Sequence, residues 1–290
     1  MTDGYIAVTD SGIGGISTLD ALKKVMPRER FLYFGDNDNA PYGNRTKDDL
    51  LKIVVNNFNY LHGFGIKAVV CACNTLSVAV LDKLRYYADV PVFGVFPPVL
   101  YAAQRYKNAL VLSTPATAKE LNASGLPDNV FCLGISRLAK EIENHAFDLS
   151  SLNVGALIDA AFNETVNANL NKNHDGDFND AFNKTITAKS GLRFCDKSGA
   201  SAVDGGRTCG YDVLIIGCTH YSFVKDKISD HFCQKKILNG NDFTASYVKN
   251  ELKHSKSLGF SCQNDVLFVG RNAAFNRFFY EKVVTDRQDF

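Results

Sequence analysis

Two cysteines occupy equivalent places in the chain, each at the end of an apolar run. Cys73 ends the run 68–73 and Cys218 ends the run 213–218, and polar residues follow both of them. Short apolar runs bounded by polar residues are typical of buried strands. A thiolate can remove a proton, and a thiol can deliver one. Two thiols that face one pocket from opposite sides could therefore invert a carbon centre.

Both cysteines stand in similar local contexts, Cys73-Asn74-Thr75 and Cys218-Thr219-His220, each followed by a stretch with helical character. The partial positive charge of a helix N-terminus lowers the pKa of a thiol, so we expect a lowered pKa at both cysteines. His220 could orient or polarise a neighbouring group. Cysteine is also a common buried core residue. A core would continue with apolar residues, however, so the two matching contexts favour a functional pair.

Other features argue against a metal or a cofactor. Cys71 lies two residues before Cys73 on the same strand face, and we interpret it as a core residue. A Cys-x-Cys pair without a second pair nearby lacks the usual spacing of a zinc site. The segment 171–176 resembles the start of a calcium loop, but Phe182 stands where a bidentate glutamate is needed. Phosphate-loop and zinc-protease motifs are absent from the sequence, and nothing marks a lysine for pyridoxal phosphate. We expect no cofactor and no metal.

Two glycine-containing segments could line a binding site. The turn Asp10-Ser11-Gly12-Ile13-Gly14-Gly15 follows the first apolar run, and such a turn exposes backbone N–H groups that suit an anion. Asp10 adds a negative charge, which disfavours phosphate and suits an ammonium group. The segment Pro41-Tyr42-Gly43-Asn44 follows Gly35-Asp36, and its amides and the Tyr42 hydroxyl could face a site. Taken alone, each segment could equally be an ordinary turn.

The pattern around these residues alternates strands with helices. Before residue 97 we predict strands at 5–9, 31–34, 68–71 and 92–96 and helices at 17–25, 46–61 and 77–87, with Thr46 and Asp49 as a capping pair. Beyond residue 98 we predict strands at 110–112, at 130–133, in the run that ends at Cys218, and at 265–269. The helices predicted there are 116–121, 137–145, 154–169, 222–232 and 272–283. This alternation predicts α/β architecture with mostly parallel sheets covered by helices on both faces. Ligands bind at the carboxyl ends of such strands, where Asp10, Asp36, Cys73 and Cys218 fall.

Pro97-Pro98 is the predicted domain boundary. We expect a first α/β domain at 1–97 plus about 241–290 and a second at 98–240. The stretch 169–210 is dominated by Asn, Asp, Gly, Lys and Ser. We interpret it as an insertion or a long mobile loop.

Composition excludes several classes of partner. The chain has 290 residues, with 32 Lys and Arg against 31 Asp and Glu, and a net charge of +1. This balance gives no electrostatic case for binding nucleic acid or an anionic membrane. The sequence has no apolar run of about 18 residues and no signal-peptide pattern at its start, so we expect a cytoplasmic protein. In that compartment the eight cysteines are expected to be reduced thiols.

Taken together, the motifs resemble those of the glutamate racemase family. The resemblance rests on the Asp10–Gly15 turn, Gly35-Asp36, Pro41-Tyr42-Gly43, Cys73-Asn74-Thr75 and Gly217-Cys218-Thr219-His220-Tyr221, all in the order of the family. The histidine after Cys218-Thr219 is more similar to glutamate racemases than to aspartate racemases, which tend to have an acidic residue there. The chain departs from the family at Ser222, where a proline is usual, and in the length of 169–210.

The resemblance implies two pseudo-symmetric, three-layer α/β domains with the active site in the cleft between them. It implies interconversion of L- and D-glutamate without a cofactor, supply of D-glutamate for peptidoglycan, and a homodimer. Cys73 and Cys218 would be the acid/base pair, assisted by Asp10 and His220. A supporting glutamate would be Glu141 or Glu143, which the sequence leaves open. The substrate would be lined by Asp10, Ser11, Pro41, Tyr42, Gly43, Asn74, Thr75, Thr117, Thr219 and His220.

Three other functions stay open from the sequence. The nearest is an aspartate or broad-specificity racemase of the same superfamily. A different class is a non-catalytic binding protein for an acidic metabolite, in which the cysteines would be core residues. A lyase or isomerase with one catalytic cysteine is disfavoured by the presence of the second.

Overall fold

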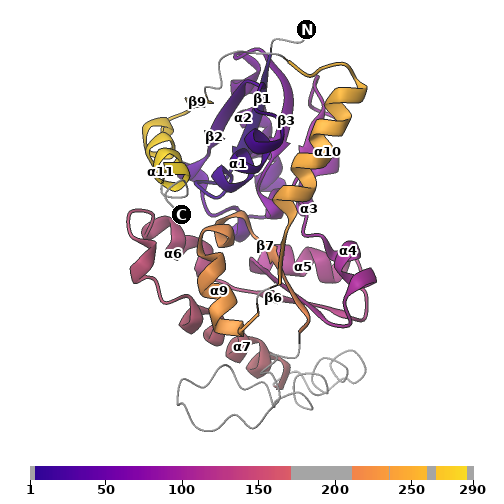
Figure 1. Cartoon of the computed structure of the whole chain (residues 1–290), viewed down its shortest axis with the longest axis vertical. Helices are drawn as coiled ribbons and strands as arrows, with labels where there is room; N and C mark the ends of the chain where they lie inside the picture. Colours follow the sequence, from indigo (N-terminus) through magenta and orange to yellow (C-terminus); the bar gives the residue numbers. More distant parts are fainter. Residues whose placement is uncertain (1–3, 171–210, 235, 260–265, 286–290) are drawn as a thin grey trace.

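The computed structural model describes residues 4–170, 211–234, 236–259 and 266–285. They form two sheets stacked along the long axis of the molecule, each with helices around it (Figure 1). The strand order is β4-β3-β1-β2-β9 in the first sheet and β6-β5-β7-β8 in the second. Every strand pairing within the described residues is parallel. The predicted fold class, two α/β units with mostly parallel sheets, is confirmed.

The first sheet is a three-layer unit because its strands are apolar on both faces. Ile6 and Val8 pack towards Leu19, whereas Ala7 packs towards Leu50 and Val80 on the other face. Successive strand residues point to opposite faces, so one strand serves two helical layers. The strands are β1 (Tyr5–Asp10), β2 (Phe31–Gly35), β3 (Ile66–Cys71), β4 (Val92–Gly94) and β9 (Val266–Val269). The helices are α1 (Ile16–Val25), α2 (Lys47–His62), α3 (Asn74–Leu84), α10 (Gly240–His254) and α11 (Ala273–Thr285), with short 3₁₀ turns η1 (Asn37–Asn39) and η2 (Tyr42–Asn44).

The second sheet repeats this construction. Leu112 and Ile216 pack into the same large hydrophobic cluster as Ile6 and Val8, so one apolar core runs from the first sheet to the second. The strands are β5 (Ala109–Ser113), β6 (Val130–Gly134), β7 (Val213–Gly217) and β8 (Ile237–Asn239). The helices are α4 (Val99–Arg105), α5 (Pro115–Ala123), α6 (Leu138–Asn144), α7 (Val154–Leu170) and α9 (Lys225–Phe232), with 3₁₀ turns η3 (Leu149–Ser151) and η4 (Thr219–Val224).

Two predicted helix starts need correction, and three elements were not predicted. α3 begins at Asn74, three residues before the predicted start, so Cys73 itself is the N-cap residue. The α-helix expected soon after Cys218 begins only at Lys225, because the intervening residues form the 3₁₀ turn η4. The elements α4, β8 and α10 lie in stretches for which no helix or strand was predicted. The predicted insertion at 169–210 lies outside the described residues, apart from the two residues that end α7.

The predicted capping pair of α2 is confirmed. The Asp49 backbone N–H donates to the Thr46 hydroxyl oxygen at 3.2 Å, and the Thr46 hydroxyl lies 2.7 Å from an Asp49 carboxylate oxygen. Such a cap satisfies an N–H group that has no partner within the helix. We expect Thr46→Ala to lower the free energy of unfolding by about 1 kcal/mol. Urea denaturation followed by circular dichroism measures this change, and an unchanged midpoint would contradict the capping role.

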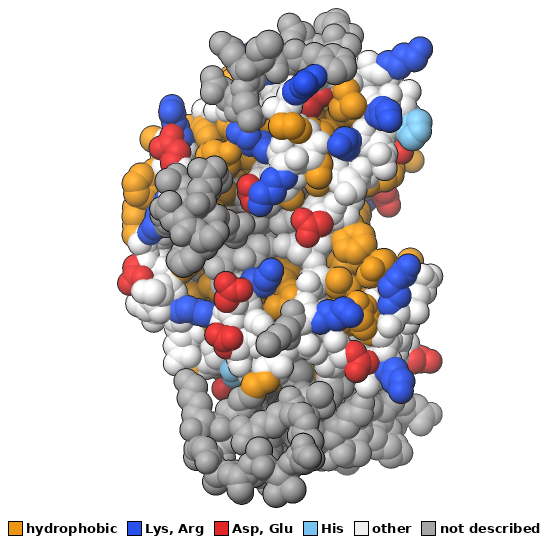
Figure 2. Space-filling view, viewed as in Figure 1, with side chains coloured by type: hydrophobic (Ala, Val, Ile, Leu, Met, Phe, Trp, Pro, Cys, Tyr) orange, Lys and Arg blue, Asp and Glu red, His pale blue; other side chains and the backbone are white. Residues whose placement is uncertain are grey.

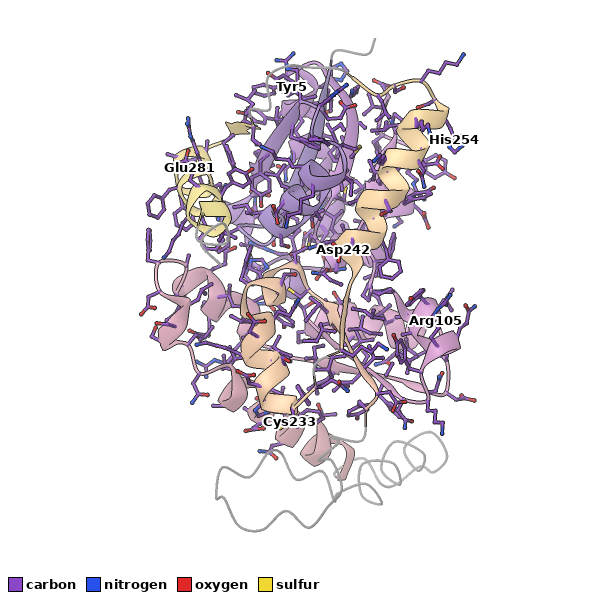
Figure 3. All side chains as sticks on the ribbon, viewed as in Figure 1. Tyr5, Arg105, Cys233, Asp242, His254 and Glu281 are labelled. Atoms are coloured by element: carbon purple, nitrogen blue, oxygen red, sulfur yellow. The ribbon has the colours of Figure 1, made fainter. Side chains whose placement is uncertain are left out.

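A buried polar junction joins the two units where the chain passes from β8 into α10. The Thr18 hydroxyl donates to the Asn241 side-chain oxygen at 2.8 Å, and the Asn241 amide donates to the Ser17 hydroxyl oxygen at 2.9 Å. Ser17 Oγ in turn lies 3.3 Å from the carbonyl oxygen of Thr219. Asp242, beside this junction, lies at the level where the two sheets meet (Figure 3). The junction therefore holds α1, α10 and η4 together at the strand ends.

An exposed apolar patch lies over α10 and α4. Figure 2 shows hydrophobic side chains gathered on the right of the view, over α10 and α4. Leu100 is 71% exposed and Tyr247 is 54% exposed. Both line a groove of about 560 Å³ that also includes Phe96 and Phe243. The groove shares no lining residue with the cavity that holds the cysteines.

Candidate active site

A cavity of about 210 Å³ lies at the carboxyl ends of the strands, between the two sheets. Cys73 follows β3 of the first sheet and Cys218 follows β7 of the second, and both line this one cavity. Their exposed fractions are 7% and 6%. The sequence pattern and the topology therefore bring two thiols from opposite units to one site.

Most of the residues predicted for the site line this cavity. They are Ser11, Pro41, Tyr42, Gly43, Cys73, Asn74, Thr75, Cys218, Thr219 and His220. Asp10 and Thr117 do not line it, but lie buried directly behind residues that do. Asp10 contacts Thr219, and Thr117 contacts Thr75. The structure thus assembles every predicted residue around one place, eight from the first unit and four from the second.

Asp10 links the glycine-rich turn to the Cys218 motif. Its carboxylate accepts hydrogen bonds from the Gly12 backbone N–H and from the Thr219 hydroxyl, both at 3.1 Å. Burial raises the pKa of the Asp10 carboxyl, while the His220 charge and these two hydrogen bonds lower it in part. Asp10 therefore fixes Thr219 relative to the first unit and places a carboxyl group behind the cavity.

His220 and Glu143 form a hydrogen-bonded pair beside Cys218. The His220 Nε2–H donates to Glu143 Oε1 at 2.7 Å, and His220 Nδ1 lies 3.8 Å from the Cys218 sulfur. Burial alone lowers the pKa of His220. The contact with Cys218 and the hydrogen bond and charge of Glu143 raise it by more, so the pKa of His220 lies well above its ordinary value. The raised pKa favours the protonated imidazole, whose Nδ1 faces the Cys218 sulfur.

The structure decides which of two candidate glutamates belongs to the site. Glu143 lines the cavity and also accepts the Ile13 backbone N–H at 2.8 Å, so it bridges the two units. Glu141 instead faces Arg137 and His145 on the outside of α6. Residues two apart on a helix point to different sides. Glu143 is therefore the glutamate that supports the second cysteine motif.

The predicted lowering of the pKa is wrong for Cys73. Burial raises the pKa of the Cys73 thiol well above its ordinary range, and the charge of Asp10 raises it further. The N–H groups of Leu76 and Thr75, at the start of α3, lower this pKa as expected, but only in part. Cys73 is therefore a protonated thiol at neutral pH, because burial outweighs the helix N-terminus.

Three threonine hydroxyls form a closed triangle on the floor of the site. The hydroxyl oxygens of Thr75, Thr114 and Thr117 lie 3.0 Å from one another in each pair. Thr114 caps α5 and Thr75 lies in the first turn of α3, so the triangle joins the two units. It holds the start of α3, and with it Cys73, against the second unit.

Hydrogen bonds with Asp36 and Asn57 fix the side chain of Tyr42. The Tyr42 hydroxyl donates to Asp36 at 2.7 Å, and the Asn57 amide contacts both groups at 3.0 and 3.1 Å. The hydroxyl that was expected to face the site is thus engaged with Asp36, and Tyr42 borders the cavity while it is 1% exposed. Asp36 positions this wall of the site instead of lining it.

Two glycines of the first turn allow the units to approach closely. A Cβ atom at Gly14 would lie 2.4 Å from the Thr219 hydroxyl oxygen and 2.5 Å from His220 Nδ1, and one at Gly12 would lie 1.9 Å from Glu143 Oε1. Ordinary contacts are longer than 3.4 Å. The turn must therefore be glycine here so that the groups around Cys218 can rest against it.

We expect Gly14→Ala to lower kcat about 10- to 100-fold, because it displaces Thr219 and His220 from their positions beside Cys218. Steady-state kinetics measure this, with thermal unfolding followed in parallel. Gly63→Ala is the matched control, since its nearest neighbouring atom would lie at 3.7 Å and its φ of −66° suits alanine. Equal kcat values in the two variants would contradict the role of Gly14.

Several lining residues were not predicted for the site. They are Asn37, Ala40, Thr114, Ala139, Lys140 and Asn144. Thr114 could have been found, because Thr114-Pro115 followed by Thr117 is a typical helix start. The others enter the site only through the packing of η1 and α6. Within the described ranges, no three His, Cys, Asp or Glu side chains gather as metal ligands.

The remaining described cysteines lie away from the site. Cys71 is fully buried in the core, as expected, and Cys132 carries a free, half-buried thiol. Cys233, at the end of α9 (Figure 3), is disulfide-bonded. This bond differs from the prediction that all eight cysteines are reduced.

Known proteins with similar sequences are racemases. A glutamate racemase of Clostridium novyi (strain NT) is 32% identical over 262 residues, which cover 89% of this chain and 87% of that protein. One from Clostridium botulinum (strain Hall) is 30% identical over 261 residues with the same coverage. The crystal structure of glutamate racemase from Francisella tularensis in complex with D-glutamate matches the fold with a TM-score of 0.65 at 21% identity, over 97% of this chain and 95% of that one. No family model matches the chain.

The fold and these relatives place the protein among the racemases, a class of isomerases. The chain belongs to the glutamate racemase family.

Proposed function

We propose that the protein interconverts L- and D-glutamate by proton transfer between two cysteines. The observation that carries this proposal is that Cys73 and Cys218, one from each sheet, line the same small cavity. Inversion at the α-carbon needs a base on one face and an acid on the other. Membership of the glutamate racemase family supports the choice of substrate.

The two cysteines would supply one base and one acid. In the proposed mechanism Cys218, whose sulfur lies 3.8 Å from His220 Nδ1, acts as the base, and the buried Cys73 thiol acts as the acid. The Cys218 thiolate takes the α-proton and becomes a thiol. Cys73 then gives its proton to the opposite face of the α-carbon and becomes a thiolate. The resulting enzyme form accepts the other enantiomer, and the reverse transfer restores the first form.

Groups at the floor of the cavity would stabilise the intermediate. Loss of the α-proton moves negative charge onto the α-carboxylate, and hydrogen-bond donors already in place lower the energy of that state. Asn74, Thr75 and Thr219 line the cavity beside the two thiols. The Asn74 amide is oriented by a 3.0 Å hydrogen bond to the carbonyl oxygen of Val95, so it does not have to reorganise.

A circular-dichroism assay with D-glutamate and L-glutamate tests the proposal. We expect the signal of each enantiomer to decay to zero, with solvent deuterium incorporated at the α-carbon in deuterated water. Faster turnover of aspartate than of glutamate would favour the aspartate racemase alternative. Binding of glutamate without loss of optical activity would favour the binding-protein alternative and overturn the proposal.

The organisation of the molecule is part of the same proposal. The two domains would be 1–97 with 241–290 and 98–240, which is supported by the division of the strands between two sheets. A homodimer, a cytoplasmic location and a role in supplying D-glutamate for peptidoglycan are supported by the resemblance to the family. Light scattering in solution tests the dimer. In the part of the chain that the structure describes, no helix is long and apolar enough to cross a membrane.

A further inference from the structure

One face of α6 borders the cavity. Its cavity-lining residues are Ala139, Lys140, Glu143 and Asn144. Positions three and four apart share a helix face, so Lys140 lies one turn from Glu143 on the cavity side. In Figure 1, α6 lies on the side of the second unit that faces the first. Lys140 is thus presented to the site by the same helix that supports His220.

Lys140 differs from the other charged groups of the site in its pairing. The positive charge of His220 is already matched by Glu143 at 2.7 Å. Asp10, behind the cavity, adds a further carboxyl group. Across the described ranges, none of the ion pairs of the molecule involves Lys140. A substrate that carries two carboxylates and one ammonium group has a net negative charge, and Lys140 is the lining cation free to meet it.

Depth in the cavity decides which carboxylate Lys140 can reach. The two thiols are almost fully buried, whereas Lys140 is exposed, so the thiols form the floor and Lys140 stands at the mouth. The α-carbon must reach the sulfur atoms, and the α-carboxylate then lies at the floor. The side-chain carboxylate lies at the other end of a flexible chain and extends towards the mouth.

We propose that Lys140 binds the side-chain carboxylate of the substrate and thereby selects an acidic amino acid over neutral ones. This proposal rests on the proposed glutamate racemase activity. The charge of the side-chain carboxylate does not change during proton transfer at the α-carbon. The contact is therefore equally strong in the ground state and the transition state, and its loss changes KM and leaves kcat unchanged.

The test is the kinetics of Lys140→Met, Lys140→Arg and Lys140→Glu with glutamate. We expect KM to rise about three- to tenfold in Lys140→Met, because an exposed ion pair has a modest strength. KM should rise further in Lys140→Glu and return towards the wild-type value in Lys140→Arg, with kcat unchanged in Lys140→Met and Lys140→Arg. Added salt should raise KM of the wild type more than that of Lys140→Met, because salt screens exposed charges.

Lys119→Met is the matched control, since Lys119 is an exposed lysine on α5 that does not line the cavity. An unchanged KM in Lys140→Met, or an equal rise in Lys119→Met, would overturn the proposal. A fall in kcat with KM unchanged would also overturn it. These outcomes differ from failure of the proposed function, in which the wild-type protein would not racemise glutamate at all.

Discussion

Replacement of either Cys73 or Cys218 by alanine is expected to lower the racemisation of glutamate by at least about 10³-fold. In the proposed mechanism each thiol serves one face of the α-carbon, and neither reaches the face served by the other. Two enantiomers have equal free energy in solution, so kcat/KM must fall equally in both directions. The circular-dichroism assay with each enantiomer measures this loss.

Isotope exchange separates lost chemistry from lost folding. The remaining cysteine in each variant can still remove a proton from one face and return one from solvent to the same face. In deuterated water, each variant should therefore exchange the α-proton of one enantiomer only, and the two variants should prefer opposite enantiomers. Cys132→Ala is the control, because this free thiol lies outside the cavity. Near-normal racemisation by either single variant would refute the two-cysteine mechanism.

Replacement of Glu143 by glutamine is expected to lower kcat/KM about 10²- to 10³-fold. The glutamine keeps the size of the side chain but removes the negative charge that keeps His220 protonated. Burial then favours the neutral imidazole, and Cys218 loses its neighbouring cation. Steady-state kinetics at neutral pH measure the effect.

The pH profile distinguishes this explanation from a loss of structure. The folded-state pKa of His220 is raised, so the protonated imidazole and its stabilising effect are present below the ordinary histidine pKa and disappear as the pH rises through the raised value. Glu143→Gln should therefore move the fall in activity at high pH to a lower pH. Glu141→Gln is the matched control on the same helix, with partners outside the site. An unshifted profile in Glu143→Gln would contradict the role of Glu143.

The cysteine-bearing strands could be predicted because of where they lie in the sheets. β3 and β7 are covered by helices on both faces, so their residues are apolar without alternation, and such runs are visible in a sequence. The helix α10 could not be predicted in the same way. Its buried face includes the polar residues Asn241 and Thr244, which are satisfied by hydrogen bonds to α1 and to the carbonyl oxygen of Gly94. A helix whose buried face is partly polar lacks the apolar stripe that reveals it.

The pair of thiols and the motifs around them could be identified from the residues alone, because residue type and strand pattern are enough to place Cys73 and Cys218 at the carboxyl ends of two parallel sheets. The choice of glutamate at the site and the protonation of Cys73 depend instead on contacts that form only when distant parts of the chain fold together. The choice between Glu141 and Glu143 depends on the face that α6 turns towards the first unit. The pKa of Cys73 depends on burial and on Asp10, which is 63 residues away in the chain and close only in the folded protein.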